Sequence, residues 1–467
     1  MRRRTKIVCT LGPSVNTREK IGHLIEAGMN VARLNCSHGD WEEKRRWIEW
    51  IRELSPKTAP IAILVDLQGP KFRVGTVPGG SIDLVQGEIV TVGPDGQIPI
   101  NQAEILAAMC PNAKLLLGDG EIELKVLGAE GQNHTARVVI GGKLGSKKGV
   151  TLVGKVFHVP ALTDKDRRDT EEAVAAGADY IALSYVKSSN DVRELRRLVD
   201  TLDSKVGICA KIEMREAVKD LDNILKVVDL IMVARGDLGL QMEIEEGPLM
   251  QKRIIHSCAD AGKPVITATQ MLESMIQNPR PTRAEVTDVA NAILDGTDAV
   301  MLSGETASGL FPIQCVKMMV KIAERAETMF DRTRIEKDFQ IRLHSGVDHT
   351  DAIAHAVSDL AHCLRPQAIL TTSTSGQTPI LVSKFRPKQP ILCATWDPRT
   401  HRRLAVVWGV ESALIPLPSG TDEVIRDAID EFLRQKRLKL GELVIITAGI
   451  PAGSPGHTNM VVTQIVK

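Results

Sequence analysis

Short apolar runs alternate with amphipathic segments along most of the chain, and this alternation limits the possible folds more than any other feature. The apolar runs are typical of buried strands, and the segments between them have the periodicity of helices. The eight strand-like runs of this series are residues 6–10, 30–35, 61–66, 180–185, 206–212, 230–234, 265–268 and 299–302. Alternating strands and helices predict a parallel α/β sheet, and eight such units are the number that closes a (β/α)8 TIM barrel.

The alternation is interrupted once and followed by a further series. From residue 73 to about residue 159 the runs are short and rich in glycine, which predicts a small all-β domain inserted in a barrel loop. After a polar stretch at 331–348, strand-like runs at 368–372 and 391–395 predict a separate open α/β domain. We therefore predict barrel at residues 1–70, an inserted β domain at 71–159, barrel again at 160–335 and a C-terminal α/β domain at 345–467.

Composition limits the partners and the compartment. The formal net charge of +1 argues against general affinity for nucleic acids or membranes, and no stretch reaches the ~18 apolar residues of a membrane span. The eight cysteines form no Cys-X-X-Cys pair, and Cys9, Cys36, Cys209 and Cys393 lie in or beside apolar runs. Such a pattern predicts buried free thiols, which fit a reducing cytoplasm.

Polar residues gather where the predicted barrel strands end. They are Arg33, Asn35 and Ser37, Asp66, Lys211 and Glu213, Arg235 to Asp237, Thr269 and Gln270, and Ser303 to Glu305. The carboxyl ends of barrel strands face one mouth, where active sites of this fold lie. The alternative is that each charged side chain is solvated separately at its own strand end. Several charges would then lie near an apolar interior, where an unpaired charge is costly. The sequence therefore predicts one shared site.

The residue types of this site favour phosphoryl transfer. Glu213 and Asp237 offer the carboxylate oxygens that Mg²⁺ prefers, and Lys211 and Arg33 suit a substrate bearing phosphate and carboxylate groups. A metal ion and fixed cations with few nucleophiles act by positioning and charge stabilisation. The residues alone indicate a metal-assisted barrel enzyme acting on an anionic, phosphorylated small molecule.

Seven segments resemble motifs of the pyruvate kinase family. They are residues 5–13, 30–39, 146–149, 232–239, 268–275, 279–285 and 301–307. The Met-Val-Ala-Arg-Gly-Asp-Leu-Gly run at 232–239 is similar to the family's metal and substrate loop, and the seven segments extend in order over nearly the whole chain. The resemblance implies the same three-domain plan, a homotetramer, and transfer of the phosphoryl group of phosphoenolpyruvate to ADP, giving pyruvate and ATP in the last step of glycolysis.

The resemblance also assigns roles in substrate binding and catalysis. The residues that it assigns to the substrate are Arg33, Lys211, Gly236, Asp237 and Thr269. Of these, Arg33 and Lys211 would hold the phosphoryl group, while Glu213 and Asp237 would bind Mg²⁺, with Mn²⁺ as a substitute. Protonation of the enolate is assigned to Thr269, Ser303 and Glu305 with a chain of waters.

Nucleotide binding would involve the inserted domain. The residues implied are Asn35, His38, Arg73 and Lys148, and a second Mg²⁺ would arrive with the nucleotide. By itself, His38 also fits an ordinary polar loop residue. Closure of the inserted domain would exclude water, which competes for the phosphoryl group.

One motif departs from the family pattern. Many members read Asp-Thr-Lys-Gly-Pro-Glu after the third strand and need K⁺, whereas residues 66–71 here read Asp-Leu-Gln-Gly-Pro-Lys. The monovalent-cation site implied by the resemblance consists of Asn35, Ser37, Asp66 and Leu67. Because Lys71 replaces a glutamate nearby, its ammonium group would supply the missing charge, and K⁺ is expected not to be required.

A serine- and threonine-rich run at 371–378 follows a strand of the C-terminal domain. The residues predicted to bind an effector there are Thr372, Ser373, Ser375 and Thr378. The resemblance implies activation by a sugar phosphate or a nucleoside monophosphate at this loop, with residues 449–456 as a wall of the pocket. A plain turn whose hydroxyls cap a helix is the alternative.

Two other functions fit parts of the sequence. Another phosphoenolpyruvate-using barrel, such as an aldolase or a phosphohistidine phosphotransferase, would explain the mouth but not the inserted and C-terminal domains. A catalytically inactive sensor of phosphosugars would be expected to have lost Lys211, Glu213, Asp237 or Thr269, and all four are present.

Overall fold

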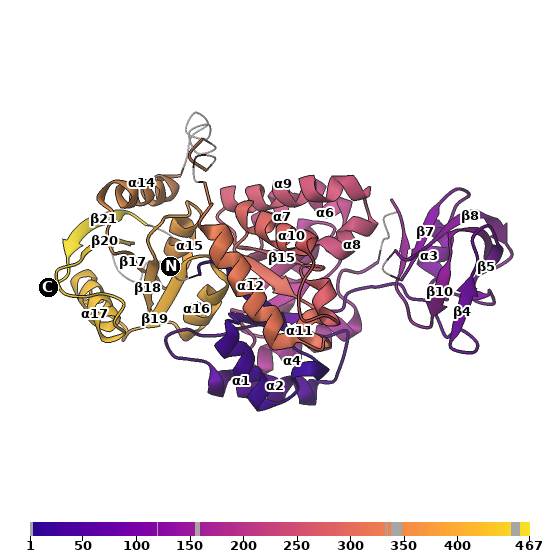
Figure 1. The fold of residues 1–467 in the computed structure, drawn as a ribbon, viewed down its shortest axis with the longest axis horizontal. Coiled ribbons are helices and arrows are strands. Elements are labelled where there is room, and N and C mark those ends of the chain that lie inside the picture. The colour runs from indigo at the N-terminus through magenta and orange to yellow at the C-terminus, as the bar shows by residue number, and fades with distance from the viewer. Residues whose placement is uncertain are drawn as a thin grey trace.

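The computed structural model describes residues 3–118, 120–154, 159–331, 333, 335–337, 348–449 and 458–467. The barrel lies in the middle of the molecule, between the inserted domain and the C-terminal domain (Figure 1). The inserted domain follows the carboxyl end of a barrel strand. The C-terminal domain contacts the opposite end, where Nζ of Lys6, the first residue of a strand, donates to the carbonyl of Val410 at 2.7 Å.

Eight parallel strands close the barrel in the spatial order β1-β16-β15-β14-β13-β12-β3-β2. They are β1 (Lys6–Thr10), β2 (Val31–Asn35), β3 (Ala62–Asp66), β12 (Tyr180–Leu183), β13 (Gly207–Ile212), β14 (Leu230–Ala234), β15 (Val265–Ala268) and β16 (Ala299–Leu302). The α-helices along this part of the chain are α1 (Arg18–Ala27), α2 (Trp41–Leu54), α4 (Asp164–Ala175), α5 (Ser189–Thr201), α6 (Arg215–Lys219), α7 (Leu221–Leu225), α8 (Arg235–Leu240), α9 (Gly247–Asp260), α10 (Arg283–Leu294), α11 (Gly304–Ala307) and α12 (Pro312–Glu327). The predicted (β/α)8 barrel is therefore confirmed.

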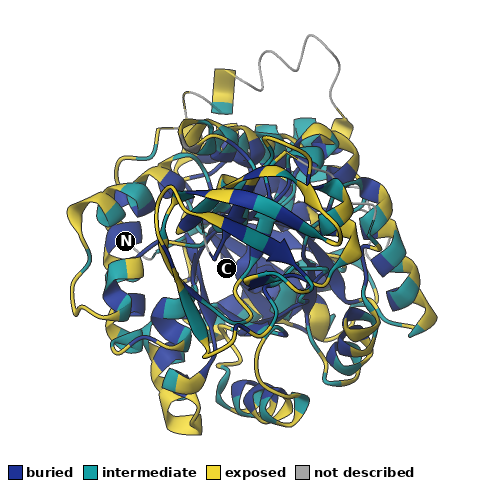
Figure 2. Cartoon of the chain, turned by 90° about the vertical axis from the view of Figure 1, so that its right-hand side faces the viewer, coloured by how far each residue is buried: buried dark blue, intermediate teal, exposed yellow. Residues whose placement is uncertain are grey.

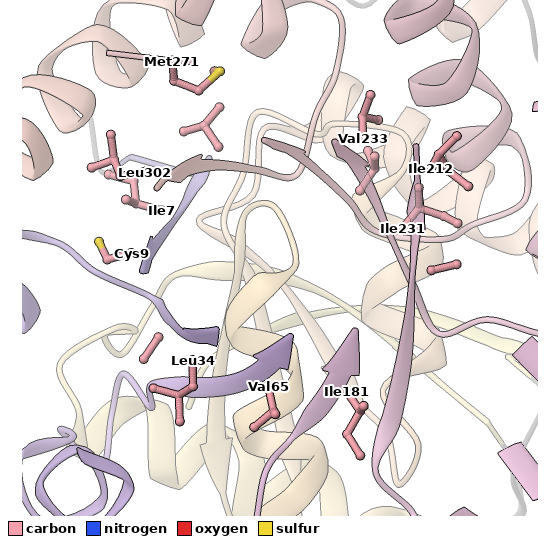
Figure 3. Close-up of a cluster of buried hydrophobic side chains, with 14 of the residues drawn as sticks. Ile7, Cys9, Leu34, Val65, Ile181, Ile212, Ile231, Val233, Met271 and Leu302 are labelled. Carbon is pink, nitrogen blue, oxygen red and sulfur yellow. The ribbon is translucent and has the colours of Figure 1, made fainter. Parts of the chain in front are cut away.

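Both faces of the barrel strands are buried. Ile7 and Cys9 of β1 belong to the apolar cluster shared with the surrounding helices, whereas Val8 between them belongs to a second cluster on the other face of the sheet. Figure 3 shows members of the first cluster on several strands, among them Leu34, Val65 and Ile181. A strand buried on both faces has no polar face, which explains why these runs are apolar throughout.

Local sequence signals fix where the helices begin and end. The Thr163 side chain accepts from Asp166 N, and the Asp166 side chain accepts from Thr163 N, a reciprocal capping box that starts α4. Thr282 and Glu285 form the same arrangement at the start of α10. At the end of α1, Gly28 adopts φ 121°, a conformation that other residues rarely accept.

The inserted domain contains a six-stranded sheet of order β11-β7-β8-β9-β5-β6 and a separate β10-β4 pair. Its elements are β4 (Ser81–Leu84), β5 (Ile89–Gly93), β6 (Ile98–Pro99), α3 (Ala103–Ala108), β7 (Lys114–Leu117), β8 (Ile122–Glu130), β9 (Asn133–Ile140), β10 (Gly142–Gly145) and β11 (Val150–Leu152). Figure 2 views the molecule from the side of this domain, whose strands combine buried and exposed residues. The predicted sheet domain is confirmed, and it also contains one short helix, α3.

The C-terminal domain is an open sheet of order β19-β18-β17-β20-β21. Its elements are α14 (His349–Leu364), β17 (Ala368–Thr372), α15 (Gln377–Ser383), β18 (Ile391–Thr395), α16 (Pro398–Arg403), β19 (Val410–Leu414), α17 (Thr421–Arg434), β20 (Leu443–Ala448) and β21 (Met460–Ile465). Four strands are parallel, and β21 pairs antiparallel with β20. The open α/β prediction is confirmed, and the structure adds strands that the sequence reading did not identify.

Cys9, Cys36, Cys209 and Cys393 are buried free thiols, as predicted. In the described ranges, none of the helices combines the length and the apolar character needed to cross a bilayer.

Candidate active site

Lys211 near the end of β13 lies at the centre of the charged groups at the barrel mouth. Its Nζ lies 2.8 Å from Oε1 of Glu213 and 3.3 Å from Oδ1 of Asp66, and it donates to Oγ of Ser184 at 2.8 Å. Burial by itself would lower the pKa of Lys211, but the two carboxylates outweigh it and raise the pKa above its ordinary value. The ammonium group is therefore permanently charged and held in one position.

Arg33 on β2 is fixed by the neighbouring strands. Its guanidinium contacts Oδ2 of Asp66 through Nε and Nη2, both at 2.7 Å, and donates from Nη1 to Oγ1 of Thr10 at 3.0 Å. Burial opposes ionisation of Asp66, but Lys211 and Arg33 outweigh it and hold the pKa of this carboxyl below its usual value. One buried carboxylate thus orients both cations that are predicted to hold the phosphoryl group.

The two predicted metal ligands follow adjacent strands, Glu213 after β13 and Asp237 in α8 after β14, and they share a neighbour, Tyr185. The N–H of Tyr185 donates to Oε2 of Glu213 at 2.7 Å, and its hydroxyl donates to Oδ1 of Asp237 at 3.3 Å. Burial raises the pKa of Glu213 above its usual value; the charge of Lys211 opposes this shift, and the nearby Asp237 adds to it. Oε1 of Glu213 forms an ion pair with Nζ of Lys211 at 2.8 Å and has no other partner among the described groups. Carboxylate oxygens are the ligands that a hard divalent cation prefers.

Lys71 and Asp237 form an ion pair at the same place. Nζ of Lys71 lies 3.2 Å from Oδ1 of Asp237, and both side chains are about one quarter exposed, at 25% and 29%. Lys71 follows the third strand by only a few residues, so the first segment of the inserted domain reaches the mouth directly. Within the described ranges, no cluster of three or more His, Cys, Asp or Glu side chains is arranged as a metal site. The candidate cation site therefore consists of two carboxylates.

Thr269 after β15 has a strained backbone. Its φ is 70°, in the left-handed region, which is unusual for a β-branched residue. Its Oγ1 accepts from the N–H of Gly236 at 2.8 Å, and its carbonyl accepts from Arg235 Nη2 at 2.7 Å. Arg235 is held in turn by Asp288 at 2.7 Å. A substrate carboxylate that bound the Gly236 N–H would have to share or replace the bond to Thr269.

Ser303 and Glu305 follow β16 and have different environments. Glu305 is fully buried, and its two oxygens accept from the N–H groups of Leu272 at 3.0 Å and Ser303 at 2.6 Å. The hydroxyl of Ser303 is buried and has no partner among the described groups. Glu305 thus joins the loops after β15 and β16. The hydroxyl of Ser303 remains available to a substrate or a water molecule.

The predicted monovalent-cation residues are close together in the structure. Oδ1 of Asn35 accepts from the N–H of Ser37 at 2.9 Å, and the carbonyl of Leu67 accepts from Oγ of Ser184 at 2.7 Å. The carboxylate of Asp66 already contacts Arg33 and Lys211. Each of these oxygens therefore has a partner within the protein.

The predicted nucleotide residues lie on both sides of the mouth. Arg73 Nη1 donates to the carbonyl of Lys147 at 3.0 Å, next to the exposed Lys148. Burial lowers the pKa of His38, and the nearby charges of Arg73, Arg33 and Lys44 lower it further. His38 is therefore neutral at pH 7. The charge of Arg73, in the first segment of the inserted domain, is close enough to affect its pKa.

Three residues of the mouth were missed by the sequence analysis: Thr10, Ser184 and Tyr185. They end β1 or follow β12, so the strand-end position that identified the other residues applied to them too. Tyr185 has a φ of 55°, and no pattern in the sequence predicts this left-handed conformation. Gly69 has φ 69°, and a Cβ there would lie 2.9 Å from both Ser184 Cβ and Tyr185 Cδ2, so only glycine fits against this turn.

The predicted effector loop connects β17 to α15. Ser373 Oγ accepts from Gly376 N at 2.9 Å, and Ser375 Oγ accepts weakly from Gln377 N at 3.4 Å. Thr378 Oγ1 bonds Thr458 Oγ1 at 2.8 Å. Thr372, Ser373 and Thr378 are buried, and Ser375 is exposed. In the predicted wall at 449–456, residues 450–456 lie outside the described residues.

The comparisons with known proteins agree over the whole chain. The family model for the pyruvate kinase barrel domain matches residues 2–316, and that for the pyruvate kinase alpha/beta domain matches residues 351–463. The pyruvate kinase of Geobacillus stearothermophilus is 45% identical, covering 100% of this chain and 81% of that protein. That of Corynebacterium glutamicum is 41% identical, covering 99% and 97%. A crystal structure of a pyruvate kinase from Cryptosporidium parvum has a TM-score of 0.92 at 35% identity and covers 100% and 96%.

A closed barrel with cations and carboxylates gathered at its mouth, together with these relatives, defines a (β/α)8-barrel phosphotransferase. The chain belongs to the pyruvate kinase family. Because both family models match, the reading as an aldolase or a phosphohistidine phosphotransferase is wrong.

Proposed function

We propose that the enzyme transfers the phosphoryl group of phosphoenolpyruvate to ADP, giving pyruvate and ATP in the cytoplasm. The observation that carries the proposal is the position of Lys211, fixed between Asp66 and Glu213 with Arg33 alongside. Two immobilised cations beside two carboxylates suit a phosphoryl group that loses its bond to one oxygen before it gains another. A coupled assay of pyruvate release from phosphoenolpyruvate, ADP and Mg²⁺ tests it, and release independent of ADP would overturn it.

Glu213 and Asp237 hold the divalent cation in this proposal, with Mg²⁺ as the ion and Mn²⁺ as a substitute. The carboxylates of Glu213 and Asp237 supply hard oxygen ligands. When bound, the cation adds positive charge next to the phosphoryl and enolate oxygens. A second Mg²⁺ accompanies the nucleotide.

The residues of the mouth also bind the substrate, orient it and serve the protonation of the enolate. Arg33 and Lys211 hold the phosphoryl group, and Lys211 stabilises it during transfer. The N–H groups of Gly236 and Asp237 with Thr269 hold the substrate carboxylate. Thr269, Ser303 and Glu305 then serve the protonation of the enolate: Ser303 has the uncommitted hydroxyl, and Glu305 holds the two loops together.

The nucleotide lies between the barrel and the inserted domain in this proposal. Asn35 and His38 contact it from the barrel, and Arg73 and Lys148 from the inserted domain. A neutral His38 suits this position, because it can accept or donate a hydrogen bond without adding charge. Closure of the inserted domain excludes water from the phosphoryl group.

We expect activity without K⁺, with Lys71 in place of the ion. The ammonium of Lys71 already lies in the mouth, and the oxygens of Asn35, Asp66 and Leu67 have protein partners. Turnover should stay close to its full value when tetramethylammonium replaces K⁺ at constant ionic strength, so that screening does not change. Near-complete loss of activity would contradict the prediction.

The variant Lys71→Glu gives a second measurement, since it should lower activity and create a partial response to K⁺. Lys125→Glu is the matched control, because it makes the same charge change on an exposed strand position of the inserted domain.

We also expect a sugar phosphate or a nucleoside monophosphate to activate the enzyme through Thr372, Ser373, Ser375 and Thr378. An activator must bind the active conformation more tightly, typically by about 1–3 kcal/mol. Candidate effectors, AMP among them, should lower the phosphoenolpyruvate concentration needed for half-maximal rate. Ser375→Asp should abolish the effect, because Ser375 is exposed and its replacement repels phosphate. Thr421→Asp at the start of α17 is the control.

Failure of every phosphorylated candidate, or unchanged activation in Ser375→Asp, would count against a phosphate pocket in this loop.

A chain of contacts from this loop to the barrel supports the proposal. Thr400 of α16 donates to the carbonyl of Thr374 at 2.7 Å, and Arg402 on the same helix pairs with Asp179 at 2.7 Å, directly before β12. The other end of β12 leads to the mouth.

We also propose that the enzyme is a homotetramer, and light scattering of the purified enzyme tests this.

A further inference from the structure

Tyr185 contacts both proposed metal ligands through two different parts of the residue. Its backbone N–H donates to Oε2 of Glu213 at 2.7 Å, and its phenol donates to Oδ1 of Asp237 at 3.3 Å. Glu213 follows β13 and Asp237 lies in the first turn of α8 after β14, so the two carboxylates belong to different βα units. Tyr185, from a third unit, is the described residue that bonds to both.

The backbone of Tyr185 makes this double contact possible. Its φ of 55° is left-handed, a conformation that is unfavourable for a non-glycine residue and persists where the surroundings enforce it. The close approach of Gly69, where a Cβ would lie 2.9 Å from Cδ2 of Tyr185, holds the ring from one side. The strain is therefore maintained by packing between β12 and the segment that leads into the inserted domain.

The phenol also decides which oxygen of Asp237 is available. Tyr185 and Lys71 both bond Oδ1, at 3.3 and 3.2 Å, and no described group donates a hydrogen bond to Oδ2. Of these two donors, the ammonium opposes binding of a nearby cation, whereas the neutral phenol orients the carboxylate without adding charge. Groups that orient a ligand in this way typically change metal affinity when they are removed.

We propose that Tyr185 is a positioning residue for the divalent cation: its phenol turns Oδ2 of Asp237 toward the ion while its N–H holds Glu213. The inference rests on the metal site of the proposed function. It assigns to Tyr185 no contact with substrate, so its loss should change cation binding more than turnover.

The test compares three near-isosteric variants in the complete enzyme. Tyr185→Phe removes only the phenol, because the ring packing and the N–H bond to Glu213 remain. Tyr180→Phe is the matched control, since the chain has only two tyrosines and Tyr180 is the first residue of β12, at the end away from the mouth. Its hydroxyl donates to the carbonyl of Arg403 at 3.1 Å. Asp237→Asn removes a proposed ligand. Free Mn²⁺ is counted by electron paramagnetic resonance with phosphoenolpyruvate and without ADP, so that no turnover occurs.

We expect Tyr185→Phe to bind Mn²⁺ about tenfold more weakly than the parent enzyme, and Tyr180→Phe to bind it equally well. The Mg²⁺ concentration for half-maximal activity should rise similarly in Tyr185→Phe, with kcat at saturating Mg²⁺ nearly unchanged. A purely structural role would instead lower kcat at every Mg²⁺ concentration. In enzyme labelled with 3-fluorotyrosine, Mn²⁺ should broaden the ¹⁹F resonance of Tyr185 much more than that of Tyr180.

The outcomes separate this inference from the function on which it rests. Unchanged Mn²⁺ affinity in Tyr185→Phe, or equal losses in both Phe variants, would overturn the role of the phenol and leave the metal site standing. Absence of Mn²⁺ binding in the parent enzyme, full affinity in Asp237→Asn, or a sharp Tyr185 resonance would instead overturn the proposed metal site.

Discussion

Lys211→Met should reduce turnover by about two to three orders of magnitude while the enzyme stays folded and still binds Mg²⁺. One fixed charge aimed at a transition state contributes about 3 kcal/mol or more. The Lys211 ammonium is such a charge, because Asp66, Glu213 and Ser184 hold it at 2.8 to 3.3 Å. Methionine keeps most of the volume of the side chain, so packing at the end of β13 should change little. Turnover, thermal unfolding and Mg²⁺ binding are the measurements.

Lys263→Met is the matched control for this prediction. Lys263 is a partly buried lysine directly before β15, and its ammonium donates to the carbonyl of Val228 at 2.8 Å. Its loss removes a partly buried ammonium group at the amino end of the barrel, away from the mouth, so turnover should be kept. If Lys211→Met binds Mg²⁺ and keeps more than about a tenth of the parent turnover, the catalytic role of Lys211 is wrong.

Glu213→Gln should lose activity for a different reason, namely weak binding of the divalent cation. The substitution keeps the size of the side chain but replaces a charged ligand by a neutral amide. It also takes one of two carboxylate partners from Lys211. We expect the Mn²⁺ affinity to fall by about tenfold to a hundredfold, and turnover to fall with it at moderate metal concentrations. Direct Mn²⁺ titration without ADP separates this outcome from that of Lys211→Met, which should still bind the ion.

The control for Glu213→Gln is Glu194→Gln on α5. Glu194 forms an ion pair with Arg167 in which both side chains are partly exposed, and such a pair contributes about 0–1 kcal/mol to stability. Its removal should change neither Mn²⁺ affinity nor turnover. If Glu213→Gln binds Mn²⁺ as tightly as the parent enzyme, Glu213 is not a ligand, and another carboxylate of the mouth must bind the ion.

Much of the fold could be predicted because strands buried on both faces leave a clear sequence signature. Apolar runs such as Ala62–Asp66 and Leu230–Ala234 stand out between amphipathic helices, and their number indicates the barrel. In the inserted domain the signal is weaker, since α3 is a six-residue helix too short to establish a period. The strands β19 and β20 of the C-terminal domain were not identified, although their apolar residues are buried as in the others.

The sequence by itself determined which residues end strands, and therefore which charges share the mouth. Closure of a parallel barrel brings all carboxyl ends together whatever their order in the chain, so Arg33 and Lys211 could be assigned to one site. Only the tertiary structure decided which of these groups touch. Asp66 bonds both cations because their strands converge on it, and Lys71 meets Asp237 because the inserted domain begins there. Tyr185 joins the two carboxylates through a left-handed backbone that packing against Gly69 maintains, and no local sequence preference predicts a conformation imposed by distant contacts.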